Sequence, residues 1–528
     1  MFKNKGQLIF RFFLVQSMIF FMFSGYQAAI GSQEVDSDIF KHFKYRHIGP
    51  PGNRVSAVYG VPDDPKIYYA GSAAGGIFKT TDGGITWAPI FDSQTILCIG
   101  SLAVAPSDSN IVWTGTGETW LRNDNKYQPI GNGVYKSTDE GKTWTHTGLE
   151  KTGRIGRIVI DPKNSDIVFV AALGHCEGPQ EERGVYRTMD GGKSWERVLF
   201  VDQNTGCIDI AMDPNNPRIL FAGMWEVEGN SSGGPGSGLH LSKDRGKTWK
   251  KLSGHGLPDP PVGKIGLAIA PSQSNRIYAL IETGGGAPWR GKKTSSGVLW
   301  KSDDGGENWE LVSYNLDMAG RAAYYTRCAV SPDDPDEIFF IAARLSTSID
   351  GGKSIKIIGR ELFGDHHDIW IDPTNADRMI ESNDGGAAIS YNRGKTWQSI
   401  NLPIAQMYHV SVDNQIPYYV YGHLQDGPSH RGPSNSRLGR GGIPRGMWHG
   451  LGGGEAGKSI PDPVDNNIIW ATGQQCGNLD RYDLRTGQTR AVDVWPVNIE
   501  VWPDAEMKYR FYRTYPIFIS PHDHNKVY

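Results

Sequence analysis

Thr80–Trp87, with the sequence TTDGGITW, decides the fold of this chain, because its pattern, Ser/Thr-x-Asp-x-Gly-x-Thr/Ser/Asn-Trp, returns six more times with small variations. Successive copies lie roughly 40 to 60 residues apart, which suits one four-stranded blade of a β-propeller for each copy. Ile355 replaces the tryptophan of the sixth copy, and an asparagine replaces the aspartate of the seventh. The central residues of the seven copies are Asp82, Asp139, Asp190, Asp244, Asp304, Asp350 and Asn392.

The residue types of the repeat suit a hairpin that leads into the outer strand of a blade. Hydroxyl and carboxylate side chains bond to the turn backbone, glycine accepts a positive φ, and tryptophan packs between sheets. No enzyme needs the same acid in six blades, so we interpret these aspartates as structural. Catalytic or binding chemistry is instead expected where the copies differ.

A second recurring phrase, a β-rich segment that ends in a Pro, Asp or Asn turn, precedes each repeat and marks the inner strand of a blade. Copies of this phrase continue to residues 517–521, which gives ten inner strands. The sequence therefore predicts an all-β fold, a β-propeller of seven or more four-stranded blades with an incomplete last blade. Residues 41–405 form its main ring, and residues 406–528 either extend that ring or begin a second propeller.

The first 31 residues have the features of a secretory signal. A basic start is followed by an apolar stretch over residues 12–23 and then by small residues up to Gly31. That stretch is too short to span a bilayer. We therefore expect a secreted or periplasmic protein without a membrane span after signal removal.

Composition excludes several classes of function. A net charge of -3 and a pI near 6.5 provide no field for binding nucleic acid or an anionic membrane. Residues 452–459 match the P-loop pattern GxxxxGK[ST], but Pro461 and Pro463 forbid the helix that a phosphate cradle requires. No cofactor is implied. The five cysteines lack a CxxC pair and are interpreted as structural thiols, although one disulfide is compatible with export.

The repeats are those of the Asp box, or bacterial neuraminidase repeat, and their run after a signal sequence resembles the sortilin N-terminal domain family of β-propellers. The chain also looks like secreted bacterial proteins labelled glycosyl hydrolases and like tandem-propeller enzymes that cleave xyloglucan. The resemblance covers residues 41–400 and implies the propeller fold, but it transfers no chemistry by itself.

Two members of the wider group of Asp-box proteins differ from this chain at identifiable places. Sialidases carry an N-terminal Arg-Ile-Pro phrase, whereas residues 46–50 read RHIGP, so sialidase activity is disfavoured. Sortilins close a ten-bladed ring and continue into a cysteine-rich module, whereas this sequence stops at Tyr528 inside an unfinished blade. We expect a fragment of a longer protein. The alternative is that residues 41–50 complete the last sheet.

Acidic and histidine side chains gather in the loops of blades seven to nine. Loops that enter an inner strand, and loops between the second and third strands, open on one face of a propeller, so their side chains surround one funnel. Two carboxylates across that funnel would serve as acid and base for glycosidic cleavage. The catalytic candidates are Asp365, Asp368, Asp384, Asp426 and Glu455.

Ligand-binding candidates lie in the same loops and in three long aromatic loops of earlier blades. They are His366, His367, His409, Gln425, Trp120, Trp225 and Trp289. Tryptophans in loops are able to stack on sugar rings or grip a peptide. The histidines together with Asp384 are an alternative cation site, but no metal spacing such as HExxH supports it, and we expect no metal. The structural alternative is that these residues cap strands or pack in the interior.

Two functions follow from these features. The first is a ligand-binding or scaffolding module for a peptide, protein or glycan. The alternative is a glycoside hydrolase acting on polysaccharide through paired carboxylates. Whether the protein is an enzyme depends on whether two of the candidate acids face one another across an open cleft.

Overall fold

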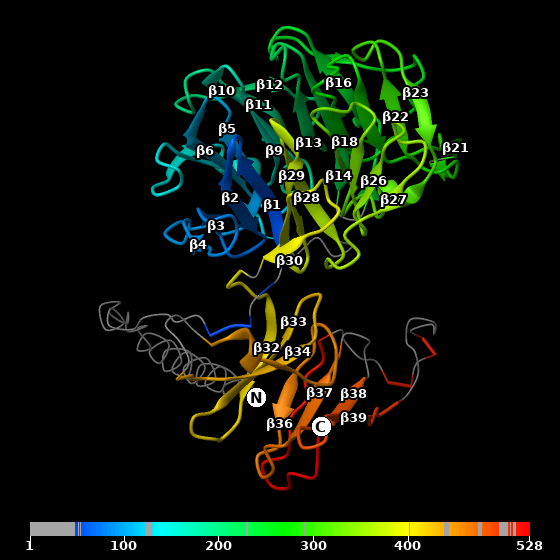
Figure 1. The fold of residues 1–528 in the computed structure, drawn as a ribbon. Coiled ribbons are helices and arrows are strands. Elements are labelled where there is room, and N and C mark those ends of the chain that lie inside the picture. Colours follow the sequence, from blue (N-terminus) through cyan, green and yellow to red (C-terminus); the bar gives the residue numbers. More distant parts are fainter. Residues whose placement is uncertain are drawn as a thin grey trace, which may run out of the picture. The chain divides into compact units, whose positions relative to one another are not determined.

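The computed structural model describes residues 48–50, 52, 54–121, 129–228, 231–289, 291–400, 402–437, 443–473, 478–495, 505–506, 508–509 and 514–528. The predicted signal of residues 1–31 lies outside these ranges. Within them, nine antiparallel sheets of four consecutive strands carry the regular structure (Figure 1). The described helical segments are three 3-10 turns, Glu150–Thr152, Leu316–Met318 and Arg445–Met447. The predicted all-β propeller is confirmed.

Blades one to four follow the expected order, with each strand paired to the next. Blade four carries the additional short strand β15. The strands are β1 (Val55–Val61), β2 (Asp64–Ser72), β3 (Ile77–Thr80), β4 (Ala88–Pro89); β5 (Ile99–Ala105), β6 (Asp108–Thr116), β7 (Val134–Ser137), β8 (Thr145–Gly148); β9 (Ile155–Asp161), β10 (Asn164–Ala172), β11 (Gly184–Thr188), β12 (Glu196–Leu199); β13 (Thr205–Met212), β14 (Leu220–Glu228), β15 (Ser231–Ser232), β16 (Gly238–Ser242) and β17 (Lys250–Lys251).

Blades five to seven repeat the arrangement, and a two-stranded ribbon of β20 and β21 is inserted in blade five. Two further four-stranded sheets, sheet eight (β32 to β35) and sheet nine (β36 to β39), follow blade seven. The strands are β18 (Ile265–Ile269), β19 (Ile277–Ile281), β20 (Pro288–Trp289), β21 (Lys292–Lys293), β22 (Leu299–Ser302), β23 (Glu310–Ser313); β24 (Arg327–Val330), β25 (Ile338–Ile341), β26 (Ser346–Ser348), β27 (Lys356–Ile357); β28 (His366–Asp372), β29 (Asn375–Asn383), β30 (Gly386–Ser390), β31 (Gln398–Ile400); β32 (Met407–Val412), β33 (Tyr419–Leu424), β34 (Ser429–Pro433), β35 (His449–Gly450); β36 (Ser459–Pro461), β37 (Ile468–Thr472), β38 (Leu479–Asp483) and β39 (Gln488–Ala491).

The first seven blades close a ring. Each inner strand contacts the inner strand of the next blade, from β1 through β5, β9, β13, β18 and β24 to β28. The ring closes because β28 also contacts β1, and the two strands lie side by side in Figure 1. Sheets eight and nine therefore lie outside the ring and contact one another through β32 and β36. After them, Ile519 and Val527 form an isolated antiparallel bridge.

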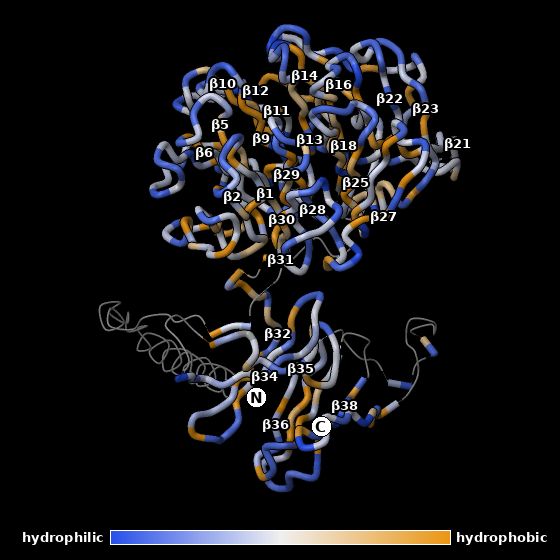
Figure 2. The backbone as a smooth tube through the Cα atoms, viewed as in Figure 1, coloured by the Kyte–Doolittle hydropathy of each residue, from blue (hydrophilic) through white to orange (hydrophobic). Residues whose placement is uncertain are grey.

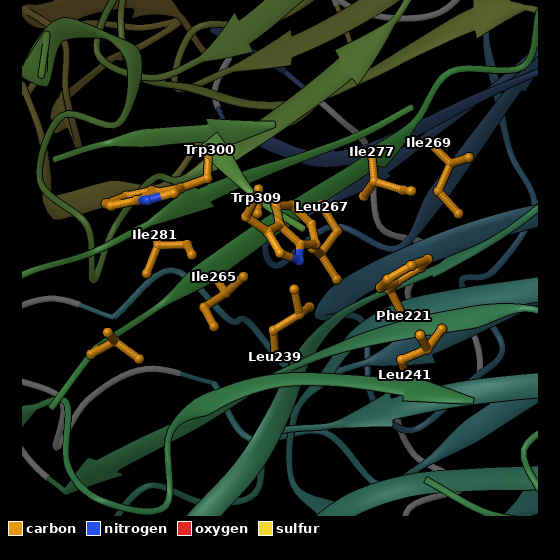
Figure 3. Close-up of a cluster of buried hydrophobic side chains, with 12 residues drawn as sticks. Phe221, Leu239, Leu241, Ile265, Leu267, Ile269, Ile277, Ile281, Trp300 and Trp309 are labelled. Atoms are coloured by element: carbon orange, nitrogen blue, oxygen red, sulfur yellow. The ribbon is translucent and has the colours of Figure 1, made fainter. Parts of the chain in front are cut away.

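The core of the ring is divided among the spaces between neighbouring blades. Figure 3 shows one such cluster, in which Phe221 and Leu239 of blade four pack against Ile265 and Trp300 of blade five. In Figure 2, apolar backbone segments concentrate in the strands, and hydrophilic ones lie in the connecting turns. The close approach of adjacent blades requires small residues, because a Cβ added at Gly71 of β2 would lie 2.5 Å from Cγ2 of Ile99 in β5. Side-chain size thus fixes how closely adjacent blades approach.

The repeated hairpins share one set of hydrogen bonds, illustrated by blade two. Ser137 Oγ donates to Asp139 Oδ1 at 2.7 Å, and Thr143 donates to both carboxylate oxygens, from its amide at 2.8 Å and its hydroxyl at 2.6 Å. The tryptophan bond varies: Trp144 Nε1 donates to the Ile90 carbonyl of the preceding blade at 2.8 Å, whereas the tryptophans of blades one, four, five and seven donate to a glycine carbonyl of their own turn. The Asp139 carboxylate is therefore bonded within its own turn.

No helix among the described residues is both long enough and apolar enough to cross a membrane.

Candidate active site on the loop face

The candidate site is built from the two loop types that were expected to open on one face. Arg54 immediately precedes the inner strand β1, and Tyr324 lies just before the inner strand β24. Asp384 occupies the tight turn between β29 and β30, and Asp426 the turn between β33 and β34. Although far apart in sequence, these four residues meet in one cluster of polar side chains.

Arg54 is the centre of this cluster. Its Nε donates to Asp384 Oδ1 at 2.7 Å, and its Nη1 donates to Glu118 Oε1 at 2.5 Å. Its third nitrogen, Nη2, donates to Asp426 Oδ2 at 3.2 Å. Arg54, Glu118 and Asp384 are almost fully buried, whereas the Asp426 side chain is 19% exposed. One planar guanidinium thus holds three carboxyl groups in fixed directions.

Asp384 is the most heavily bonded acid of the cluster. Besides Arg54, it accepts from Tyr324 OH at 2.9 Å and lies 2.5 Å from His367 Nε2. Burial alone would raise the pKa of this carboxyl group, but the interactions with His367 and Arg54 hold it well below its usual range. Asp384 is therefore a permanent carboxylate that anchors its neighbours.

Asp426 behaves in the opposite way. Burial, the adjacent Asp384 carboxylate and a hydrogen bond to it raise the pKa of Asp426 to about 8, although Arg54 opposes the change. Glu455 adds a further, smaller increase. At neutral pH, Asp426 is thus the protonated member of the Asp384–Asp426 pair. Two neighbouring carboxyl groups with widely separated pKa values are the usual sign of an acid and its stabilising partner.

Glu455 is held close to Asp426 by the side-chain amide of Gln425. The nitrogen Nε2 of Gln425 donates to Asp426 Oδ1 at 2.7 Å and to Glu455 Oε1 at 2.5 Å. The nearest oxygens of the two acids are therefore no farther apart than these two distances combined. Gln425 is itself fixed, because its oxygen accepts from Tyr408 OH at 2.6 Å. Asp426 and Glu455 are both partly exposed.

His423 forms hydrogen bonds to the loop that carries Glu455, on both sides of that residue. Its Nδ1 lies 2.6 Å from the Gly454 carbonyl, and its Nε2 lies 2.7 Å from Ser459 Oγ. The carbonyl only accepts, so Nδ1 carries the hydrogen and Nε2 accepts from the hydroxyl. Burial lowers the pKa of His423 to about 4, so this neutral form persists at physiological pH. Glu455 therefore projects from a fixed backbone.

Two other predicted acids are engaged elsewhere. Asp368 accepts from Arg327 Nη1 at 3.0 Å and from Arg157 Nη1 at 3.2 Å, so its charge is compensated next to the inner strands. Asp365 accepts a hydrogen bond from Tyr325 OH and lies 3.6 Å from Arg321 Nη2. The structure places neither acid in the Arg54 cluster.

The predicted histidines have three different environments. His367 belongs to the cluster, where its ring also packs on Trp120 with centroids 4.7 Å apart. His366 is buried against Glu381, with Nδ1 2.6 Å from Oε2. His409 is exposed on β32, and its φ of 46° accompanies a shift in the pairing of β32 with β33.

The aromatic candidates are a correction to the sequence analysis. Trp120 and Trp225 are 1% and 0% exposed and pack in the interior, so their rings are not free to stack on a sugar. Trp225 lies on strand β14 and not in a loop, and both rings are buried because this removes their large apolar area from water. Trp289, on the short ribbon of blade five, is the partly exposed one of the three.

Three residues of the Arg54 cluster were not predicted from the sequence, namely Arg54, Glu118 and Tyr324. The sequence prediction favoured the acids and histidines of blades seven to nine, whereas these three belong to blades one, two and six. A signal did exist, because all three flank strands in the same two loop types. Among the described residues, no group of three or more His, Cys, Asp and Glu side chains is arranged to hold a metal ion.

Comparison with known proteins connects this chain to two groups. The family model described as "Sortilin, neurotensin receptor 3" matches residues 132–257 and 183–344. A xyloglucanase of Acetivibrio thermocellus is 24% identical over 367 residues, which cover 62% of this chain and 41% of the enzyme. A probable oligoxyloglucan-reducing end-specific xyloglucanase of Neosartorya fischeri is 20% identical over 406 residues, covering 67% of this chain and 46% of the enzyme. The chain therefore spans less than half the length of these curated relatives.

A similar fold is found among solved structures. The GH74 xyloglucanase of Xanthomonas campestris superimposes with a TM-score of 0.55 at 15% identity, covering 85% of this chain and 81% of that enzyme. At this identity the likeness concerns the fold, and it agrees with the propeller of four-stranded blades described above.

Proposed function

We propose that the protein is a glycoside hydrolase that cleaves a polysaccharide with Asp426 as general acid and Glu455 as its partner. The observation that carries the proposal is the arrangement around Gln425, whose single amide nitrogen bonds to both acids. The raised pKa of Asp426, about 8, keeps a proton available at neutral pH. Similarity to xyloglucanases favours a glycoside hydrolase over a sortilin-type scaffold.

The close approach of the two acids favours a retaining reaction. Retaining glycosidases place their carboxyl groups about 5–5.5 Å apart, whereas inverting enzymes leave room for a water molecule. In the first step the Glu455 carboxylate attacks the anomeric carbon, and the Asp426 proton passes to the departing glycosidic oxygen. In the second step Asp426 takes a proton from water, which hydrolyses the glycosyl–enzyme bond. Asp384 takes no part in bond making, because Arg54, Tyr324 and His367 occupy it.

The substrate class follows from the relatives, which are named for cleaving xyloglucan or its oligosaccharides. We propose a β-glucan backbone of this type. The features of residues 1–31 support export of the protein, which would bring it into contact with such polymers. The packing of sheets eight and nine on each other supports assigning them to a second propeller.

The test is release of reducing ends from xyloglucan and other plant and bacterial polysaccharides. The wild-type protein should release them, and Glu455→Gln should release almost none, because it lacks the carboxylate that attacks the anomeric carbon. Asp82→Asn, a carboxylate of a repeat hairpin, is the matched control and should keep its turnover. Equal turnover in wild type and Glu455→Gln would rule out the assigned pair.

A ligand-binding module is the second candidate. The match to the sortilin model covers residues 132–344, which lie within blades two to six and exclude both proposed acids. A binding role therefore does not require Asp426 or Glu455. It predicts that a Glu455→Gln variant retains polysaccharide or peptide affinity measured by calorimetry while neither protein releases sugar.

A further inference from the structure

The Arg54 cluster joins the blade-seven turn to the turn that carries the proposed acid. Arg54 Nε bonds to Asp384 at 2.7 Å, while Nη2 of the same guanidinium bonds to Asp426 at 3.2 Å. Because the guanidinium is planar and rigid, the direction of one bond determines the direction of the other. Nothing in the repeat pattern requires this connection, since the two acids belong to different sheets.

We infer that Asp384 and Arg54 form a positioning pair for Asp426: Asp384 places its negative charge beside the Asp426 carboxyl group, and the planar Arg54 guanidinium holds the two carboxyl groups in a fixed relative orientation. This inference rests on the proposed hydrolytic role of Asp426. Asp384 supplies the negative charge that disfavours ionisation of Asp426, and Arg54 fixes the distance at which that charge acts. Neither residue touches the substrate in this account.

The contacts of Asp384 explain why it remains the ionised member. Tyr324 OH donates to Oδ2 at 2.9 Å, and His367 Nε2 lies 2.5 Å from Oδ1. Both groups are buried, so solvent does not replace these bonds. Arg54 Nη2 lies 3.2 Å from Asp426, farther than the 2.7 Å between Arg54 Nε and Asp384, so the guanidinium stabilises the Asp384 charge at the shorter distance. The proton is therefore retained on Asp426.

The other charged groups around Asp426 act in known directions. Arg54 lowers its pKa, whereas Asp384 and Glu455 raise it. Glu118 is bound to Arg54 Nη1 at 2.5 Å and takes up part of the positive charge that would otherwise favour ionised Asp426. Gln425 and Tyr408 are neutral and contribute bonds without charge. The balance depends on Asp384 more than on Glu455, because Asp384 is the larger contribution.

The experiment is a direct titration of the Asp426 carboxyl group by ¹³C NMR in protein labelled at the aspartate side-chain carboxyl carbons, with Asp426→Asn used to assign the signal. In the wild-type protein, Asp426 should titrate near pH 8. Asp384→Asn should lower that pKa by at least one unit, a tenfold loss of proton affinity. Asp365→Asn removes another loop acid outside the cluster and should leave the titration unchanged.

A second variant keeps the test decisive if Asp384→Asn does not fold. Arg54→Lys retains a positive charge for Asp384 but cannot hold two acids in one planar fork, so the Asp426 pKa should rise. An unchanged Asp426 titration in either folded variant would overturn the inference. The alkaline limb of the kcat–pH profile should move with the NMR titration. A shifted Asp426 titration in the variants, without turnover by the wild-type protein, would support the positioning pair and reject the hydrolase. Turnover by the wild-type protein with an unchanged Asp426 titration in the variants would support the hydrolase and reject the positioning pair.

Discussion

Aspartates of the repeat hairpins and Asp426 of the loop face have pKa values that are shifted in opposite directions. In the hairpins, hydrogen bonds from the residue four positions later lower the pKa of each aspartate to about 2, as for Asp82 and Asp139. At the loop face, burial and a neighbouring carboxylate raise the pKa of Asp426 to about 8. Local bonds within one turn stabilise a fold, whereas convergence of distant loops produces an acid suited to proton transfer.

The largest expected effect on stability comes from removing the cation of the loop-face cluster. Arg54→Met leaves Asp384 and Glu118 buried without their shared partner, which should lower the free energy of unfolding by about 3–5 kcal/mol. Urea denaturation followed by tryptophan fluorescence measures the change.

Arg321→Met is the matched control for that variant. Arg321 also lies beside an aspartate, but its side chain is 70% exposed, so the change should stay within about 0.5 kcal/mol. Equal losses in the two variants would mean that the cluster at Arg54 is no more consequential than a surface ion pair.

A smaller effect is expected from a single hairpin. Asp139→Ala removes the acceptor for Ser137 and Thr143 and should lower the Tm by only a few degrees, because the remaining blades are untouched. The loss should also depend on pH. The folded pKa is depressed to about 2 from 3.8, so the aspartate stabilises the fold above pH 4 and this contribution fades as pH falls through 2.

Calorimetric melting of wild type and Asp139→Ala at several pH values measures this dependence. The two Tm values should differ at pH 7 and converge near pH 2. A difference that persists undiminished at pH 2 would show that the carboxylate charge is not what locks the hairpin.

The smallest effect on stability is expected in the seventh hairpin, where Asn392 already replaces the aspartate of the other repeats. Asn392 accepts from the Thr396 amide at 2.9 Å and donates to the Thr396 hydroxyl at 2.8 Å, so the asparagine keeps the hairpin bonds with one direction reversed. Asn392→Asp should change the free energy of unfolding by no more than about 0.5 kcal/mol. Chemical denaturation of Asn392→Asp and of Asp139→Asn, which makes the reverse exchange, measures both changes in the free energy of unfolding. A larger change in either variant would show that the hairpin depends on the charge of the side chain.

The fold was predictable because its signals are local. Asp139 bonds to residues within four positions, so the hairpin and its period can be read directly from the sequence. The loop face was predictable in part, since Asp384, Asp426, Gln425 and His367 were expected there and meet in the structure.

The remaining features depend on packing that sequence spacing does not encode. Arg54 and Asp384 are 330 positions apart, and only ring closure between β1 and β28 brings them together. The burial of Trp120 and Trp225 likewise depends on packing against residues distant in the sequence, which an aromatic residue in a glycine-rich segment does not reveal. Long-range contacts therefore limited the prediction of the site more than that of the fold.

We propose that the irregular loops, and not the repeats, carry the chemistry of this protein. The measurement that separates the two is the initial rate of reducing-end release from xyloglucan at pH 7 by Asp426→Asn and by Asp139→Asn. Asp426→Asn should lose roughly 10²–10⁴-fold in kcat, while Asp139→Asn should keep the wild-type rate. A wild-type rate in Asp426→Asn, or equal losses in both variants, would contradict this proposal.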